Sequence, residues 1–186
     1  MMRASYANRG KWLEEAVLAC AQLARRRHEA VIEKIATPYV LPRAGDNGRS
    51  TMIRKRSTVD FIGVVFGHPV AFDAKAVTGQ RLPVANVKRH QVEFLTDFAR
   101  AGGVACLLVA FGRDRVFLAD AAWWCLRCRD ADRSGRKSIR VEVFAGAPPE
   151  MVACVPRARG YMLDVPGAVA ALALARGRDI FEAVSS

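Results

Sequence analysis

The 186-residue sequence has no apolar run long enough to cross a bilayer, which takes about 20 consecutive apolar residues in a helix. Its most apolar tail segment, residues 165–175, is short and rich in alanine. The first eleven residues are polar and basic, so we expect no signal peptide. These absences predict a cytoplasmic protein with no membrane partner.

Cysteine is scarce. The chain has five cysteines, an odd number, and they are scattered along the sequence. This usage argues against a disulfide framework and favours reduced thiols in the cytoplasm. Cys125 and Cys128 have the spacing of a zinc-ligand pair, but no second pair of cysteine or histidine lies at a suitable distance. A structural zinc site is therefore not expected.

The sequence also lacks the motifs of several large enzyme classes. It contains no phosphate-binding loop of the Walker type, no glycine-rich dinucleotide fingerprint and no zinc-protease HExxH motif. No internal repeat is visible either. We expect no nucleotide cofactor.

Acidic residues are few relative to basic ones, with 18 Asp and Glu against 29 Lys and Arg and a net charge of +11. Because 52% of the residues are hydrophobic, the chain can bury an adequate core, and the charge must lie on the surface. We predict a single domain over residues 1–186. A surface of this kind attracts polyanions, and nucleic acid is the first candidate.

Two short segments in the middle of the chain predict a β-hairpin. Residues 59–66 and 70–77 are rich in β-branched and aromatic side chains. Between them, Gly67 at the first central position favours a two-residue type II′ turn with His68. This turn would fix the register of the two strands.

The predicted register places Asp60 opposite Lys75, with Asp73 on the same face of the hairpin. Two carboxylates this close repel each other unless a cation or a proton lies between them. Mg²⁺ is the simplest candidate, because it binds one or two carboxylates and leaves positions for water and phosphate. Lys75 would then orient or deprotonate the attacking water, or stabilise charge on phosphorus. The alternative is a plain salt bridge on a solvent-facing hairpin.

Two helices contribute further candidates. A helix over residues 11–27 carries Glu14 off its main packing face, either as an ordinary exposed residue or on a second surface beside the hairpin. A helix over residues 86–100 carries Gln91 on its packing face, so we expect a buried polar partner for it. That partner is either the hairpin site or an ordinary core group.

The remaining pattern predicts alternating strands and helices. Residues 104–111 form a continuous apolar run, typical of a central buried strand. Residues 77–84 and 130–140 are predicted as loops, the second of them basic. The other expected elements are strands over 30–35 and 116–118 and helices over 119–129 and 166–176.

A basic segment precedes the hairpin and contains a Gly-Asp-Asn-Gly turn signal. It is either a solvated loop or a protrusion that grips phosphates beside the hairpin, and its position favours the second interpretation. Its candidate DNA-binding residues are Arg43, Arg49, Arg54, Lys55 and Arg56. The candidates elsewhere are Arg9, Arg81, Lys88, Arg89, Arg136, Lys137 and Arg140.

The order of helix, strand, Asp, hairpin strand with Asp-x-Lys, helix and strand resembles the PD-(D/E)xK nuclease core. This resemblance implies an α/β fold with a mixed central sheet flanked by helices. Further motifs resemble, in order, those of the RecU family of Holliday junction resolvases. They are Asn8-Arg9-Gly10 with Glu14, Thr37-Pro38, residues 57–60, residues 72–75, Leu82-Pro83, residues 90–93, the Gly-Arg-Lys-Ser-Ile-Arg run at 135–140, and Gly160-Tyr161.

The resemblance implies a metal site of Asp60 and Asp73 with Glu14 assisting, Lys75 as the catalytic lysine, and Gln91 on the bordering helix. It further implies a homodimer that uses Mg²⁺ or Mn²⁺ to cut four-way DNA junctions during recombination and repair. Residues 37–56 take the place of the family's stalk. Asp73 stands where the family usually has Glu, which keeps the charge but shortens the side chain.

Two other functions are compatible with the same residues. One is another PD-(D/E)xK nuclease that cuts ordinary or damaged duplex. The other is a non-catalytic DNA-binding recombination factor on the same fold. The acidic pair with lysine argues against the second.

Overall fold

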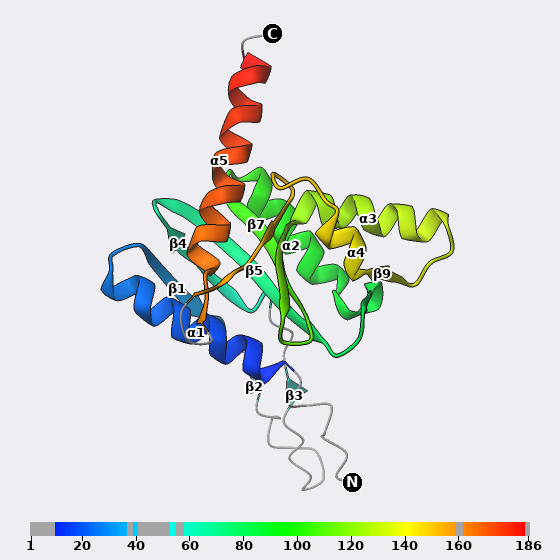
Figure 1. Ribbon diagram of the computed structural model, residues 1–186, viewed down its shortest axis with the longest axis horizontal. Helices are drawn as coiled ribbons and strands as arrows, with labels where there is room; N and C mark the ends of the chain where they lie inside the picture. Colours follow the sequence, from blue (N-terminus) through cyan, green and yellow to red (C-terminus); the bar gives the residue numbers. More distant parts are fainter. Residues whose placement is uncertain (1–9, 37–38, 41–52, 55–57, 159–161, 185–186) are drawn as a thin grey trace, which may run out of the picture.

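A six-stranded mixed sheet forms the centre of the molecule. The computed structural model describes residues 10–36, 39–40, 53–54, 58–158 and 162–184 (Figure 1). Neighbouring strands are antiparallel except β5 and β7, which run parallel and are joined by the crossover helix α2. In spatial order the strands are β1 (Ala30–Lys34), β4 (Phe61–Val65), β5 (His68–Val77), β7 (Val104–Phe111), β8 (Arg115–Asp120) and β10 (Val152–Cys154).

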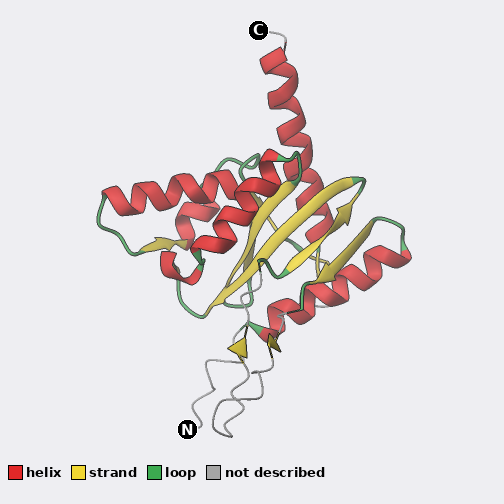
Figure 2. Ribbon diagram, turned by 180° about the vertical axis from the view of Figure 1, so that it is seen from behind, coloured by secondary structure: helices red, strands yellow, loops and turns green. Residues whose placement is uncertain are grey.

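Helices cover both faces of this sheet (Figures 1 and 2). One face packs against α1 (Lys11–Arg26) and α5 (Val165–Val184), through buried residues such as Leu13, Val17 and Leu172. The other face packs against α2 (Arg89–Arg100), α3 (Ala121–Arg133) and α4 (Val141–Ala145). The mixed sheet flanked by helices is the fold class that the sequence predicts.

Strand β7 confirms the prediction of a central buried strand. Each of its eight residues is buried, and it lies between β5 and β8. Because both faces of β7 are covered by helices, the strand needs apolar side chains in both directions, which explains its unbroken apolar sequence. No helix in the described part of the chain is long and apolar enough to cross a membrane.

Three two-stranded pairs complete the described structure. Strand β2 (Tyr39–Val40) pairs with β3 (Ile53–Arg54), β6 (Arg81–Pro83) with β9 (Ser138–Arg140), and β11 (Arg157–Ala158) with β12 (Met162–Leu163). The β2–β3 pair brings the two ends of segment 41–52 together. The interior of that predicted stalk lies outside the described residues.

The hairpin turn differs from its prediction. The turn residues are Phe66 and Gly67, and both have positive φ, as a type I′ turn requires. Val65 therefore pairs with His68, and the register is shifted by two residues from the predicted one. Because side chains alternate with a period of two, this shift keeps every residue on its predicted face.

Other predicted boundaries were also wrong. The predicted loop 77–84 contains β6 and a short 3-10 helix, η2 (Val84–Asn86), so that α2 begins only at Arg89. The predicted basic loop 130–140 contains the end of α3 and all of β9. At the carboxyl end, α5 is one helix of 20 residues. Strands as short as β6 and β9 have too few residues to show a periodic pattern, and they exist because they pair with each other.

Candidate active site

The carboxylates of Asp60 and Asp73 lie close together at the start of β4, beside the middle of β5. Phe61 pairs with Phe72, so Asp60, one residue before β4, lies opposite Asp73. The backbone N–H of Ala74 donates a hydrogen bond of 2.9 Å to Asp60 Oδ2. This bond fixes the half-buried Asp60 carboxylate against β5.

Asp73 is completely buried, with no exposed surface. The side chain of Gln91 donates from Nε2 to Asp73 Oδ1 at 2.5 Å, and Lys75 Nζ forms an ion pair with Oδ2. Apart from that ion pair, no hydrogen bond from the described residues reaches Oδ2. A completely buried carboxylate beside a second carboxylate is unusual and points to a functional site.

Burial raises the pKa of Asp73 from its ordinary value of 3.8 to about 7. The Lys75 ammonium opposes this rise, and the neighbouring Asp60 carboxylate adds to it. The direction follows from the cost of placing a second negative charge in a water-poor position. Additional positive charge close to Asp73 would therefore favour its negatively charged form at neutral pH.

Gln91 connects the carboxylates to the start of α2. Its Oε1 accepts a hydrogen bond of 2.9 Å from the backbone N–H of Lys88, the residue that precedes the helix. Its Nε2 donates to Asp73, as described above. Of the two partners considered for Gln91, the structure thus shows the hairpin carboxylate.

The donor set fits a divalent, oxygen-preferring cation. Asp60 lies opposite Asp73 and close enough to raise its pKa, and apart from the Lys75 ion pair Asp73 Oδ2 has no hydrogen bond from the described residues. A cation of the Mg²⁺ type binds through one or two carboxylates and keeps water and substrate phosphate as its other ligands. Within the described ranges, no three His, Cys, Asp or Glu side chains gather closely enough to hold a metal ion.

Glu14 does not join the carboxylate pair in this structure. Its side chain forms an ion pair of 2.6 Å with Lys34 at the end of β1. Lys34 is paired with Phe61, the neighbour of Asp60, so Glu14 lies at the same end of the sheet. However, α1 packs on the opposite face of the sheet from α2, and Asp73 faces α2.

The predicted DNA-binding residues fall into three groups. Lys88 and Arg89 are exposed at the start of α2, beside Gln91. Arg81, Arg136 and Arg140 line one pocket, and Lys137 is exposed next to them. Of the others, Arg54 lies in β3, and Arg9, Arg43, Arg49, Lys55 and Arg56 are outside the described residues.

Arg127 was not singled out by sequence reasoning, yet it lines the same pocket as Arg81, Arg136 and Arg140. It lies on α3, in a segment whose helical character is predictable from sequence. Which strand or loop this helix face meets depends on tertiary packing, so no local signal could have identified it.

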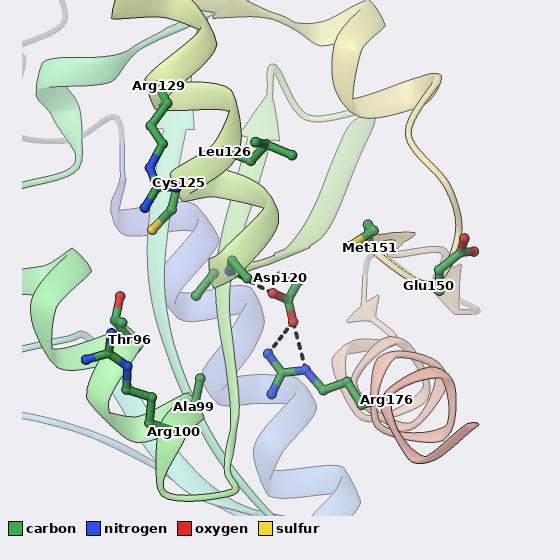
Figure 3. A pocket seen from close by; sticks show the side chains of 12 residues that line it. Thr96, Ala99, Arg100, Asp120, Cys125, Leu126, Arg129, Glu150, Met151 and Arg176 are labelled. Atoms are coloured by element: carbon green, nitrogen blue, oxygen red, sulfur yellow. Dashed lines mark hydrogen bonds and ion pairs between the residues drawn. The ribbon is translucent and has the colours of Figure 1, made fainter. Parts of the chain in front are cut away.

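Another hollow of the described structure lies away from the carboxylate pair. It has a volume of about 760 Å³ and is lined by parts of α2, α3 and α5 and by Glu150 and Met151 (Figure 3). Asp60, Asp73 and Lys75 do not line it. On its floor, Asp120 accepts a hydrogen bond of 2.9 Å from Arg176 Nε and caps α3 through a 2.7 Å bond from the Ala122 N–H. These contacts give Asp120 and Arg176 a structural role.

Comparisons with known proteins agree on one family. The family model described as recombination protein U matches residues 8–161. The Holliday junction resolvase RecU of Geobacillus thermodenitrificans (strain NG80-2) is 32% identical over 146 residues, which cover 74% of this chain and 73% of the relative. The protein of the same name from Mycoplasmopsis pulmonis (strain UAB CTIP) is 35% identical over 135 residues, 73% of this chain and 79% of the relative.

A solved structure, that of the Holliday junction resolvase Hjc from Archaeoglobus fulgidus, was also found. Its TM-score is 0.41 and its sequence identity is 17%, and the match covers 61% of this chain and 73% of that chain.

Proposed function

The chain belongs to the recombination protein U family, and from this premise we infer that it is a metal-dependent endonuclease that resolves Holliday junctions. The observation that carries this inference from the family to the molecule is the buried Asp73. It lies opposite Asp60, forms an ion pair with Lys75 and accepts a hydrogen bond from Gln91. This is a site for hydrolysing a phosphodiester.

Asp60 and Asp73 would hold the metal ion, for which Mg²⁺ or Mn²⁺ is our proposal. When bound, such an ion supplies positive charge that polarises the phosphate and lowers the pKa of a water molecule. Glu14 would assist after leaving Lys34. The other side chains act directly: Lys75 orients the attacking water or stabilises charge on phosphorus, and Gln91 holds the Asp73 carboxylate in position.

The symmetry of a four-way junction determines how many active sites are needed. A four-way junction has two-fold symmetry, so paired nicks in opposed strands need two active sites related by the same symmetry. We therefore propose that the protein acts as a homodimer, on DNA in the cytoplasm at the nucleoid. Segment 37–56, within which β2 pairs with β3, would then act as the stalk that enters the junction.

Two single substitutions test this division of roles. Asp73→Ala and Lys75→Ala should each lower the rate of junction cutting by about 10²- to 10⁴-fold, because each removes a group that acts on the reacting phosphate or its water. Junction affinity should change little, since the exposed basic residues remain. Cleavage is measured on a labelled four-way junction in Mg²⁺, and binding by gel shift without metal.

Matched controls are available on the exposed surface. Asp97→Ala and Lys11→Ala remove the same charges from exposed ion pairs and should leave both cutting and binding unchanged. Loss of junction binding in folded Asp73→Ala protein, or normal cutting by Lys75→Ala, would contradict the assigned roles.

A further inference from the structure

Four arginines from different elements line a single pocket of about 490 Å³. Arg81 comes from β6, Arg127 from α3, Arg136 from the turn after α3, and Arg140 from β9. One carboxylate, that of Asp130, lines the pocket with them. The pocket is therefore strongly positive.

The β6–β9 pair places two of these charges side by side. Arg81 pairs directly with Arg140, and directly opposed residues of antiparallel strands point to the same side. Leu82 and Ile139, the next pair along, are buried toward the core, so the two arginines point outward. Like charges placed directly opposite each other destabilise a strand pair unless an opposite charge compensates them.

The end of α3 brings the other two arginines to the same place. Gly135, with φ of +65°, turns the chain after the helix, and the Arg136 N–H donates a 2.7 Å bond back to the Ala131 carbonyl. Arg127, about one turn before Ala131, lies over the Trp123 ring with its guanidinium carbon 5.9 Å from the ring centroid. Its Nε is buried without a hydrogen-bond partner in the described structure.

The carboxylates near the pocket do not balance this charge. Asp130 forms an ion pair of 3.0 Å with Arg127, and Glu142 forms one of 3.0 Å with Arg140. For Arg81 and Arg136, the described part of the chain provides no ion-pair partner. Several guanidinium groups around one hollow form a site for a phosphate group, because the planar donor fork matches phosphate oxygens in pairs.

The pocket lies on the same face of the sheet as the candidate active site. Leu82 and Ile139 belong to the buried cluster that also contains Leu95 of α2 and Ala71, two residues before Asp73 on β5. Arg81 follows Lys75 by six positions, so their Cα atoms are at most about 22 Å apart. The pocket and the candidate active site are therefore close enough to contact the same DNA arm.

We propose that this arginine pocket (Arg81, Arg127, Arg136 and Arg140) binds one backbone phosphate of a junction arm, on the same arm as the phosphate that is cut. The inference rests on the proposed function, since it takes the ligand to be DNA. A phosphate bound here fixes the position of the DNA arm along the protein surface. That position determines which phosphodiester bond lies beside Lys75. The pocket is a positioning site and takes no part in the chemistry.

Neutralising single phosphates in the DNA tests the pocket. Junctions carrying one methylphosphonate at each successive position of an arm are bound to the protein without divalent metal. In the wild-type protein, one position should weaken binding by about tenfold, because a hydrogen-bonded charge pair is lost there. In an Arg81→Gln/Arg136→Gln variant that same methylphosphonate should cause no further loss, which is the coupling expected of two groups in contact.

The matched control removes the same charge from the opposite face of the sheet. Arg26→Gln/Arg27→Gln changes two exposed residues at the end of α1, and it should keep the wild-type sensitivity at the identified phosphate. Circular dichroism melts confirm that both variants are folded. A pocket variant that keeps the wild-type sensitivity, or a wild-type protein with no sensitive position, overturns the proposal. If the protein cuts no DNA but the phosphate and the pocket residues are coupled, the pocket proposal is supported and the proposed function is contradicted.

Discussion

At the scale of single residues, Asp73 combines complete burial with a role that needs a negative charge. It is fully buried, yet the proposed chemistry requires it to be negatively charged. Lys75 and Gln91 provide part of the compensation, and a bound divalent cation would provide the rest. The metal-free protein should therefore hold this carboxylate at a cost in stability that disappears when the carboxylate is protonated.

This cost predicts a specific pH dependence. The folded pKa of Asp73 is raised to about 7 from an ordinary value of 3.8, so between these values the folded chain binds more protons than the unfolded chain. The free energy of unfolding should therefore fall as pH rises through this window. In urea unfolding with EDTA, the wild type should lose more than about 1 kcal/mol relative to Asp73→Asn between pH 5 and pH 8.

Asparagine is the appropriate control because it is nearly isosteric with the protonated acid and cannot ionise. Mg²⁺ at pH 8 should recover stability in the wild type and not in Asp73→Asn, because a ligand stabilises the state that binds it. Parallel stability curves for the two proteins between pH 5 and pH 8 would show that Asp73 is not strained by its charge.

At the scale of elements, the last helix is attached to the sheet through Arg176. Its guanidinium forms an ion pair with Asp120 and donates a 2.8 Å hydrogen bond to the Gly103 carbonyl. Asp120 is 5% exposed and also caps α3. One buried carboxylate thus joins β8, α3 and α5 (Figure 3).

Arg176→Ala should destabilise the protein by about 2–4 kcal/mol, because it leaves the Asp120 charge buried without its partner. The measurement is the free energy of unfolding in urea. Lys11→Ala is the matched control, since it breaks an exposed ion pair with Glu15 and should cost less than about 1 kcal/mol. Equal losses in the two variants would mean that Arg176 does not anchor α5.

The elements also show what can be predicted from sequence. The unbroken apolar run of β7 and the face of α2 that carries Gln91 and Leu95 follow from periodicity alone. The hairpin turn does not, because Phe66 adopts a positive φ that its residue type disfavours. The prediction of the shared face survived this error, since the shift of two residues leaves Asp60, Asp73 and Lys75 on one side.

The sequence identifies Arg81, Arg136 and Arg140 as candidate DNA-binding residues, but it does not predict that they meet in one pocket with Arg127. Its residues come from segments up to 59 positions apart, and they meet only because β6 pairs with β9 and α3 ends beside that pair. Short strands of this kind are stabilised by long-range pairing and leave no local pattern. The ion pair between Glu14 and Lys34 is likewise a tertiary contact that helical spacing cannot reveal.

At the scale of the whole molecule, the two faces of the sheet differ in role. The face of α2 and α3 carries Asp73, Lys75 and the arginine pocket, whereas α1 and α5 cover the other with a largely apolar core. A net charge of +11 favours the approach of a polyanion without selecting a face, so the arrangement of specific groups must select the face that binds. We therefore expect each arm of the junction to lie against the α2 and α3 face.

The central claim is tested most directly by cutting of a synthetic mobile four-way junction beside linear duplex of the same sequence, with and without Mg²⁺. We predict paired, symmetric nicks in the junction alone, and only when metal is present. Equal cutting of the linear duplex would contradict junction specificity and leave a general nuclease. Tight junction binding with no cutting in any metal would contradict the enzymatic assignment itself.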